Sequence, residues 1–492
     1  MNLPKKDIKK YILVGLLVFL VLITLVTPYY GSTDIGDYGD VAKYFAGDYS
    51  AKIRSSHSYM YGILHSFLVG ISDSFIFFKI TSLIFLGLIV YSVYIISGKR
   101  KETLLMMMFL PIVWYIAPWI SPIQISSLFL LWSYYFMKKY QTTEKISNLI
   151  YSGSLIGFGW VFWDTTIYFG AILGITFLYN KKVNHAFAFV IGIFFGLIPR
   201  LIADQIMFNF AFFTTVKTFI AGFVSIFAKG IYAGSQYVPN TFMTYMLVLL
   251  AFPIGFWMLY KKKYWGKYKK DLIFLGLSVL LILTNPQIRY VLAIAPIIII
   301  LIAENIEIRE SKIQKIVSFI VLAVFVLPYI LQIGATVNNS IYGVEISVIA
   351  RNPTSFSIGT ISPSQIIVKD INDISKEYPN QNFVVGNDPD DYQTIAHFYW
   401  GKEVKELVSI QDYELYISNK SVIFERKFEP VPNVAERRQF WIEGGLKKNT
   451  NDKTDYENIT LAIGLGEPIK LDGFKIIKKY DYLYLSGRDS DK

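Results

Sequence analysis

The chain has 492 residues, 53% of them hydrophobic, and its mean hydropathy of +0.41 lies well above the usual range of soluble proteins. Its net charge of +11 comes largely from Lys and Arg clusters between long apolar runs, which excludes nucleic acid as the partner. The sequence contains no cysteine, which excludes disulfides and thiolate chemistry.

Long apolar runs, each near the ~20 residues needed to cross a ~30 Å hydrocarbon core, predict about eleven transmembrane helices. The first run follows MNLPKKDIKK and has no small-residue cleavage site, so we expect a retained anchor. In chain order the predicted spans are 11–29, 74–97, 103–119, 122–138, 147–162, 165–180, 184–203, 241–260, 271–285, 288–304 and 314–334.

Basic residues are concentrated in alternate loops, as in KKKYWGKYKK at 261–270. This positive-inside pattern predicts a multi-pass protein of the plasma membrane with a cytoplasmic N-terminus. An odd number of spans then places the C-terminus outside.

The C-terminal third is polar and strand-rich, and it predicts a separate soluble domain. PSQIIVKDINDISKEY has helical periodicity, whereas NFVVG and ELYISNKSVIFERK read as strands. We therefore expect a transmembrane domain over 1–335 and an extracytoplasmic α/β domain over 336–492.

Two expected external segments, 30–73 and 204–240, are longer than a connection requires. Such long loops in compact proteins are often functional. The second is apolar enough to lie along the membrane interface.

The first external segment contains Asp34, Tyr38 and Ala42 at intervals of four, which places them on one face of a helix. On the same helix, Asp37 is rotated away from that face. A helix start with acidic residues at its positive end is the equally good structural reading.

Further motifs follow in order: a G-D-Y turn at 47–49, and H-x-x-x-Y formed by His57 and Tyr61. With D-x-x-x-Y-x-x-x-A before them, they resemble the first external loop of GT-C glycosyltransferases. The nearest branch is that of protein O-mannosyltransferases and lipid A aminoarabinose transferases. NPQIRYVLAIAPIIIILIAE, with Arg289, Tyr290 and Pro296, is similar to a later span of that family.

The sequence departs from the family pattern at several positions. Ile35 stands where an acidic residue often follows the first aspartate, and Ser58 and Tyr59 replace the prolines after the histidine. Asp164 replaces a lysine between the fifth and sixth spans, and Gln124 replaces an acidic residue near the start of the fourth. The chain thus looks like a divergent member.

The resemblance implies inverting transfer of a sugar from a polyprenyl phosphate, dolichyl or undecaprenyl, to a lipid, glycan or protein acceptor outside the membrane. It makes Asp34 the general base, because such a transfer needs a carboxylate near the acceptor hydroxyl. Asp37 would assist, or would bind a divalent cation such as Mg²⁺ or Mn²⁺ together with Asp34. No cofactor is certain.

The leaving phosphate needs cations at the outer face. Arg289 is the first candidate because a guanidinium matches phosphate with two hydrogen bonds. Lys79, Arg200 and Arg54 are further candidates; snorkelling at span ends is the alternative for the arginines in apolar surroundings. Lys79 is also a plausible partner for a first-loop acid.

His57, Tyr38, Tyr61 and Asp164 are expected to contact the acceptor or to have a structural role. Asp164 lies in GWVFWDTTIYFG, where a carboxylate should be paired, protonated or next to a water-filled cavity. The sequence allows either the acceptor or Arg289 as the partner of Asp164.

Two other classes of function remain open: a polytopic transporter, and a catalytically silent lipid-binding scaffold of the same fold. Transporters often show internal repeats and charged residues near mid-membrane. Here no repeat is evident and most ionisable candidates gather at the expected outer face. This pattern favours an interfacial enzyme that works among membrane lipids.

Overall fold

The computed structural model describes residues 5–26, 34–47, 59–69, 71, 76–108, 110–117, 119–216, 262–284, 288–305, 370, 373–374, 376–379, 381, 383–385, 407–409, 459–465, 468–481 and 483–488. The helices are α1 (Lys5–Val26), α2 (Asp34–Phe45), α3 (Met60–Val69), α4 (Ile76–Ile96), α5 (Lys101–Met108), α6 (Pro111–Ile116), α7 (Ile123–Thr143), α8 (Ile146–Phe162), α9 (Thr166–Leu178), α10 (Val183–Phe208), α14 (Lys262–Thr284), the 3₁₀ helix η1 (Ile288–Ala293) and α15 (Ala295–Asn305). The strands are β1 (Phe383–Val385), β2 (Leu407–Ser409), β3 (Leu461–Leu465), β4 (Phe474–Lys479) and β5 (Leu483–Arg488).

These elements fall into two compact units. The first contains α1, α5–α9, α14, η1 and α15, with nearly all of α4 and α10. The second contains α2, α3 and the strands. The predicted domain boundary at 335/336 lies outside the described residues.

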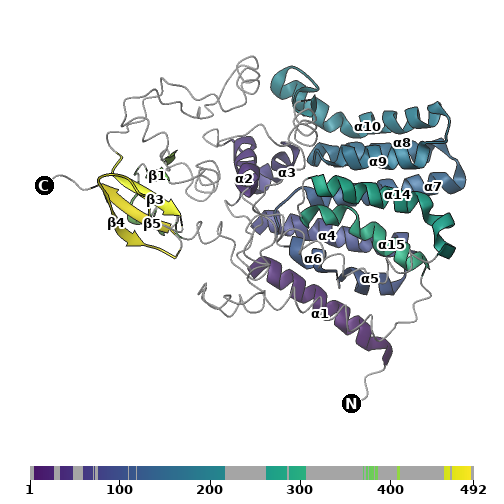
Figure 1. Ribbon diagram of the computed structural model, residues 1–492, viewed down its shortest axis with the longest axis horizontal. Helices are drawn as coiled ribbons and strands as arrows, with labels where there is room; N and C mark the ends of the chain where they lie inside the picture. The colour runs from purple at the N-terminus through teal and green to yellow at the C-terminus, as the bar shows by residue number, and fades with distance from the viewer. Residues whose placement is uncertain are drawn as a thin grey trace. The chain divides into compact units, whose positions relative to one another are not determined.

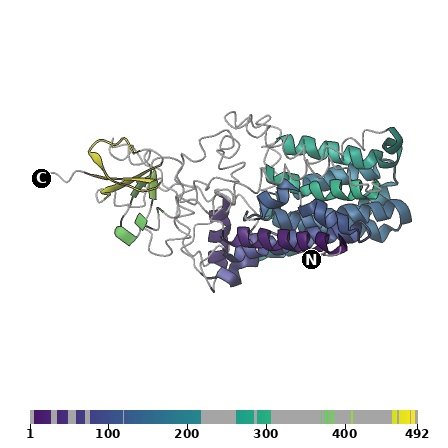
Figure 2. The ribbon, with the colours of Figure 1, turned by 90° about the horizontal axis from the view of Figure 1, so that it is seen from below.

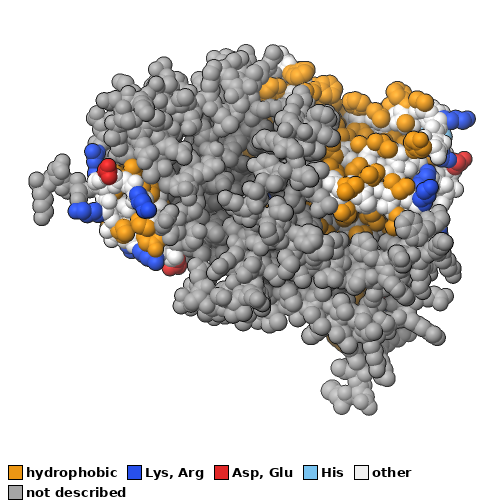
Figure 3. Space-filling model, in the orientation of Figure 1, with side chains coloured by type: hydrophobic (Ala, Val, Ile, Leu, Met, Phe, Trp, Pro, Cys, Tyr) orange, Lys and Arg blue, Asp and Glu red, His pale blue; other side chains and the backbone are white. Residues whose placement is uncertain are grey.

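The helices of the first unit run side by side in a bundle (Figures 1 and 2). Within the described part, Ile76–Ile96 and Val183–Met207 are long and apolar enough to cross a membrane, judged by length and composition. In Figure 3, hydrophobic side chains are spread over the part of the bundle that is drawn in colour. The helix α10, for example, exposes Phe187, Phe194 and Ile202. An apolar surface of this extent is typical of contact with lipid.

The helices follow most of the predicted spans closely, with two breaks. The expected span 288–304 is divided into the 3₁₀ helix η1 and α15. The expected span 103–119 is divided into α5 and α6. Pro111 is the first residue of α6, where its missing N–H has no cost, whereas inside a longer helix it would remove a hydrogen bond. The expected spans 241–260 and 314–334 lie outside the described residues.

Two G-x-x-x-G motifs bring α8 and α10 into backbone contact. Gly153 and Gly157 lie on α8, and Gly192 and Gly196 lie on α10. A Cβ on any of the four would meet a backbone carbonyl oxygen of the other helix. Small residues are what allow such close approach between apolar helices, where no hydrophobic force distinguishes protein from lipid.

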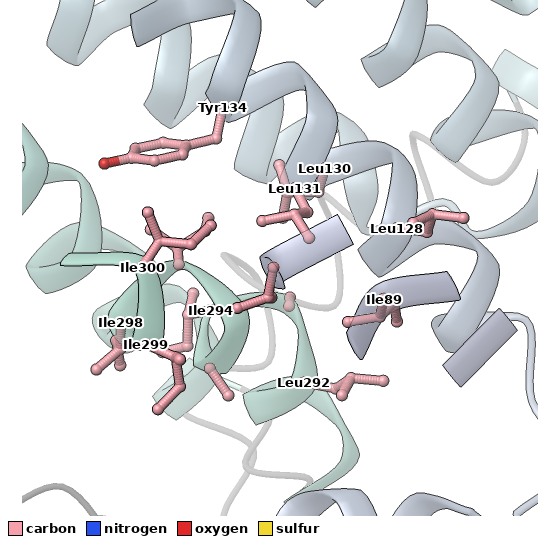
Figure 4. Packing of buried hydrophobic residues seen from close by; sticks show 14 of the residues in the cluster. Ile89, Leu128, Leu130, Leu131, Tyr134, Leu292, Ile294, Ile298, Ile299 and Ile300 are labelled. Atoms are coloured by element: carbon pink, nitrogen blue, oxygen red, sulfur yellow. The ribbon is translucent and has the colours of Figure 1, made fainter. Parts of the chain in front are cut away.

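The core of the bundle is formed mainly by α7, η1 and α15. Leu130 and Leu131 of α7 are buried in one cluster with Leu292 of η1 and with Ile294, which directly follows η1 (Figure 4). The run of isoleucines in α15 is also buried there. Because α15 is apolar on all sides, it suits a position inside the bundle rather than on its surface.

The described strands form one mixed sheet in the order β2-β1-β3-β5-β4. β1 pairs in parallel with β2 and β3, whereas β5 runs antiparallel to β3 and β4. The predicted strand NFVVG corresponds to β1, and ELYISNKSVIFERK lies outside the described residues. One face buries Leu461, Leu483 and Leu485.

Candidate functional site

The helix α2 begins at Asp34, as the four-residue spacing of the sequence predicts. Asp34 and Asp37 lie in its first turn, where the positive end of the helix dipole favours acidic residues. Tyr38 and Ala42 are both buried. The helical reading of this motif is therefore confirmed, while the catalytic roles of the two aspartates stay predictions.

The helix α3 packs along α2 and completes a small hairpin. The Tyr38 and Tyr61 rings meet edge to face, with their centroids 5.0 Å apart, so the structure brings together one tyrosine from each of the two motifs. Gly62 faces Val41 so closely that a Cβ would collide with the Val41 side chain. The contacts with α3 thus fix the position of α2 within the hairpin.

His65 is fully buried in this hairpin. Its Nδ1 lies 2.7 Å from the carbonyl oxygen of Tyr61, which can only accept, so Nδ1 carries the proton. The Tyr61 and His65 ring centroids are 4.5 Å apart. Burial lowers the pKa of His65 to about 4, against a smaller raising effect of the Tyr61 hydrogen bond. His65 is therefore neutral and structural near pH 7.

Two predicted site residues, Arg54 and His57, lie outside the described residues. Among the described residues, no group of three His, Cys, Asp or Glu side chains is arranged to hold a metal ion. The divalent cation that Asp34 and Asp37 would share therefore stays a prediction.

Lys79 is a buried cation at the beginning of α4, with 2% exposure. Its Nζ donates a hydrogen bond of 3.0 Å to the carbonyl oxygen of Thr24 near the end of α1. A buried ammonium in an apolar span is expensive and commonly functional. The bond to Thr24 holds the Lys79 amino group next to the last turn of α1 and the first turn of α4.

Arg289 is surrounded by aromatic rings. Its Cζ lies 5.7 Å from the centroid of the Trp119 ring and 5.6 Å from that of Tyr290. Tyr290 in turn lies 5.1 Å from Trp163, the residue before Asp164. Aromatic faces attract a guanidinium, so the two rings help to hold Arg289 in place.

Arg200 is the centre of a buried polar network. With 1% exposure, its Nη1 donates to Asp164 Oδ1 at 2.5 Å and to the carbonyl oxygen of Trp160 at 3.0 Å. Its Nε donates to Thr214 Oγ1 at 3.1 Å, and the Thr214 hydroxyl donates to Asp204 Oδ1 at 2.6 Å. The network joins the α8–α9 turn to α10 and to the segment after α10. Asp164, for which the acceptor and Arg289 were the expected partners, is paired with Arg200.

Gln124 also has a defined structural contact. Its Nε2 donates to the carbonyl oxygens of Ile116 and Trp119, at 3.1 Å and 2.9 Å. The amide thus closes the turn between α6 and α7, a task that a carboxylate in the same position could not perform because it has no N–H to donate.

Sequence reasoning missed a second buried charge cluster at the opposite end of the bundle. Asp271 accepts from the Tyr134 hydroxyl at 2.5 Å and from Lys138 Nζ at 2.7 Å, which joins α14 to α7. The signal was present, because Asp271 directly follows GKYKK and precedes an apolar run. Lys181 Nζ lies 2.8 Å from Glu144 Oε1, and these two residues lie in neighbouring loops at the same end of the bundle.

The tertiary contacts therefore sort the loops into two groups, as the basic-loop pattern predicts. Contacts of Lys181 with Glu144, of Lys270 with Gln141 and of Lys138 with Asp271 gather expected cytoplasmic segments. Contacts of Arg200 with Asp164 and of Ser82 with Trp119 gather expected external ones. Which end faces the cytoplasm stays a prediction.

No protein-family model matches the sequence, and no curated protein matches it. Solved structures do share its fold. ArnT from Cupriavidus metallidurans bound to undecaprenyl phosphate matches 98% of each chain, with a TM-score of 0.63 and 11% identity. The same protein in the apo state matches 97% of each chain, with a TM-score of 0.55 and 11% identity. The chain thus shares the fold of these two structures over nearly its whole length.

Proposed function

We propose that this protein is a membrane glycosyltransferase that uses a sugar linked to a polyprenyl phosphate. The observation that carries the proposal is the fold shared over 98% of both chains with ArnT, which was solved with undecaprenyl phosphate bound. The order of the sequence motifs supports it independently. In this proposal the chain spans the cell membrane several times, with a transmembrane domain over 1–335 and an extracytoplasmic domain over 336–492.

We assign the general base to Asp34 and an assisting role to Asp37. In the proposed step, an acceptor hydroxyl oxygen bonds to the anomeric carbon of the sugar with inversion, and its proton passes to the Asp34 carboxylate. The bond between the anomeric carbon and the phosphate oxygen breaks, which releases the polyprenyl phosphate. The position of Asp34 at the beginning of a packed helix supports this assignment. A divalent cation bound by both carboxylates belongs to the same proposal.

We assign the phosphate mainly to Arg289 and Lys79. Arg289 lies against two aromatic rings, and Lys79 donates a hydrogen bond to the Thr24 carbonyl oxygen. A guanidinium can match phosphate with two hydrogen bonds, and an ammonium binds it as a point charge. Arg200 is the weaker candidate, because Asp164 offsets its charge and Thr214 accepts from its Nε. Arg54 remains a proposed contributor, as do Tyr38, Tyr61, His57 and Asp164 on the side of the lipid, glycan or protein acceptor.

The test is transfer from a panel of radiolabelled polyprenyl-phosphate sugars by the purified chain and by Asp34→Asn. We expect transfer by the wild type and its loss in Asp34→Asn, with donor binding retained. Glu144→Gln, which changes an exposed carboxylate at the opposite end of the bundle, is the matched control and should transfer normally.

The outcomes separate the alternatives. If transfer persists in Asp34→Asn, the general base is another residue, and Asp37 and Asp164 are the next candidates. Donor binding without transfer by any form would favour a silent lipid-binding scaffold. Uptake of solute into vesicles without transfer would favour a transporter.

A further inference from the structure

Trp119, in the segment between α6 and α7, is held by hydrogen bonds from two other helices. Its carbonyl oxygen accepts from Ser82 Oγ of α4 at 3.1 Å and from Gln124 Nε2 of α7 at 2.9 Å. Gln124 Nε2 also donates to the carbonyl oxygen of Ile116 at the end of α6, at 3.1 Å. Ser82, Trp119 and Gln124 are all buried. The helices α4 and α7 therefore fix the position of Trp119 together.

The indole ring of Trp119 lies against Arg289, with 5.7 Å between the ring centroid and Arg289 Cζ. Because a guanidinium is attracted to an aromatic face within about 6 Å of the centroid, the indole has little room to move away before the contact is lost. The Tyr290 ring also lies near Arg289, but it is the next residue and shares the same stretch of backbone. Trp119 comes from a distant part of the chain. Through it, α4 and α7 determine where Arg289 lies.

The helix α4 also carries Lys79, one turn before Ser82. Side chains three residues apart lie on one face of a helix, and both of these are buried. Lys79 donates to the Thr24 carbonyl oxygen and Ser82 to that of Trp119. Trp119 therefore contacts one of the two cations that we assign to the donor phosphate, and it is bonded to the helix that carries the other.

We propose that Ser82 and Gln124 are positioning residues for the donor phosphate, which act by holding Trp119 against Arg289. This inference rests on the proposed function, because it takes Arg289 and Lys79 as the cations that bind the phosphate. A guanidinium donates two parallel hydrogen bonds to phosphate only in a narrow range of orientations, so a small displacement of Arg289 weakens binding. Ser82 and Gln124 act through Trp119 and do not contact the phosphate in this proposal.

Two substitutions remove these donors while each carbonyl oxygen keeps another one. In Gln124→Met, the Ile116 carbonyl oxygen still accepts from the Trp119 backbone N–H at 3.0 Å, and the Trp119 carbonyl oxygen still accepts from Ser82. In Ser82→Ala, the Trp119 carbonyl oxygen still accepts from Gln124. Neither variant leaves these buried acceptors without a hydrogen bond, so we expect both variants to fold.

The measurement is binding of undecaprenyl phosphate and of undecaprenol to the purified full-length protein in detergent. The two lipids differ only in the phosphate, so a general loosening of the bundle weakens both, whereas displacement of Arg289 weakens undecaprenyl phosphate alone. We expect each variant to lower the preference for undecaprenyl phosphate about fivefold, the usual effect of losing one hydrogen bond. The double variant should lower it by more than the product of the two single effects, because both donors share one acceptor. In transfer assays the KM for the donor should rise with kcat nearly unchanged.

Ser133→Ala and Gln141→Met are the matched controls on the helix α7. Ser133 Oγ donates to the Ser152 carbonyl oxygen of α8 at 2.8 Å, and Gln141 Nε2 donates to the Phe177 carbonyl oxygen of α9 at 3.3 Å. Each control thus removes a hydrogen bond between helices that does not involve Trp119 or Arg289. Thermal unfolding of all variants is measured in parallel. The controls should leave the preference for undecaprenyl phosphate unchanged even where they lower the unfolding temperature.

The outcomes separate this inference from the proposed function. If the wild type prefers undecaprenyl phosphate and both variants keep that preference in full, the positioning role is wrong and the proposed function stands. If the controls lower the preference as much as the variants do, the effect belongs to the bundle in general, and the positioning role is again wrong. If the wild type binds undecaprenyl phosphate no more tightly than undecaprenol, the proposed donor site is overturned together with this inference.

Discussion

Arg200 Nη1 lies 2.5 Å from Asp164 Oδ1, and this ion pair joins α10 to the turn between α8 and α9. The guanidinium is 1% exposed and the carboxylate 23%. Removing Asp164 takes away the counter-charge that directly contacts this buried guanidinium, and leaves Asp204, on the other side of Thr214, as the acidic residue of the network. We expect Asp164→Ala to destabilise the fold by about 3 kcal/mol, the lower part of the usual range because water still reaches the carboxylate.

The exposed pair of Lys181 and Glu144 is the matched control for this prediction. Glu144→Ala should destabilise the fold far less, because solvent screens exposed pairs. Denaturant titrations of both variants in detergent micelles give the comparison. Equal losses for the two variants would mean that Arg200 finds another partner when Asp164 is removed.

The glycine contact between α8 and α10 gives a second prediction. A Cβ at position 196 would meet the Ser154 carbonyl oxygen, which cannot move aside without moving the helix. Gly196→Ala should therefore destabilise the bundle by about 1–3 kcal/mol, as overpacking does. Gly276→Ala on α14, where no atom lies within 4 Å of the added Cβ, should be neutral or stabilising by up to about 1 kcal/mol. Thermal unfolding in detergent measures both, and a neutral Gly196→Ala would contradict the close packing.

The buried His65 predicts a pH dependence of the α2–α3 hairpin. Its pKa is lowered to about 4, from an ordinary value near 6.5, so the unfolded hairpin binds the proton more readily. The stability that neutral His65 provides is complete above pH 6.5 and is lost as the pH falls toward 4, by about 3 kcal/mol in all. Hydrogen exchange of α2 and α3 peptides, corrected for intrinsic rates, should show opening that increases across this range.

His65→Leu should remove that dependence, because no proton can then bind at this position. The matched control is His185→Leu in the bundle, where His185 Nδ1 contacts the Tyr140 hydroxyl at 2.6 Å. It should leave the pH profile of the hairpin unchanged. A profile that survives His65→Leu would place the responsible group elsewhere.

Arg289 gives a prediction about the donor, and it rests on the proposed function. Arg289→Lys keeps the charge but loses the planar pair of donors that phosphate accepts. We expect the KM for the polyprenyl-phosphate sugar to rise about tenfold or more, as loss of a charge-assisted hydrogen bond would require, with a smaller effect on kcat. Arg488→Lys on the exposed end of β5 should change neither.

Local features of the fold could be predicted from the sequence. The four-residue spacing of Asp34, Tyr38 and Ala42 predicts the helix α2 that contains them, and the ends of α8 and α9 lie within about two residues of the predicted spans. The strand β1 was also expected. Each of these depends on apolar length, periodicity or residue order within one short window.

The sequence by itself thus determined most of the described helices of the bundle, and which first-loop residues share a helical face. The tertiary structure decided that Asp164 meets Arg200, that Asp271 meets Lys138 and Tyr134, and that two pairs of glycines face one another. These residues are 36 to 137 positions apart. A helix is specified by neighbours along the chain, whereas the partner of a buried charge is fixed only when distant segments pack together.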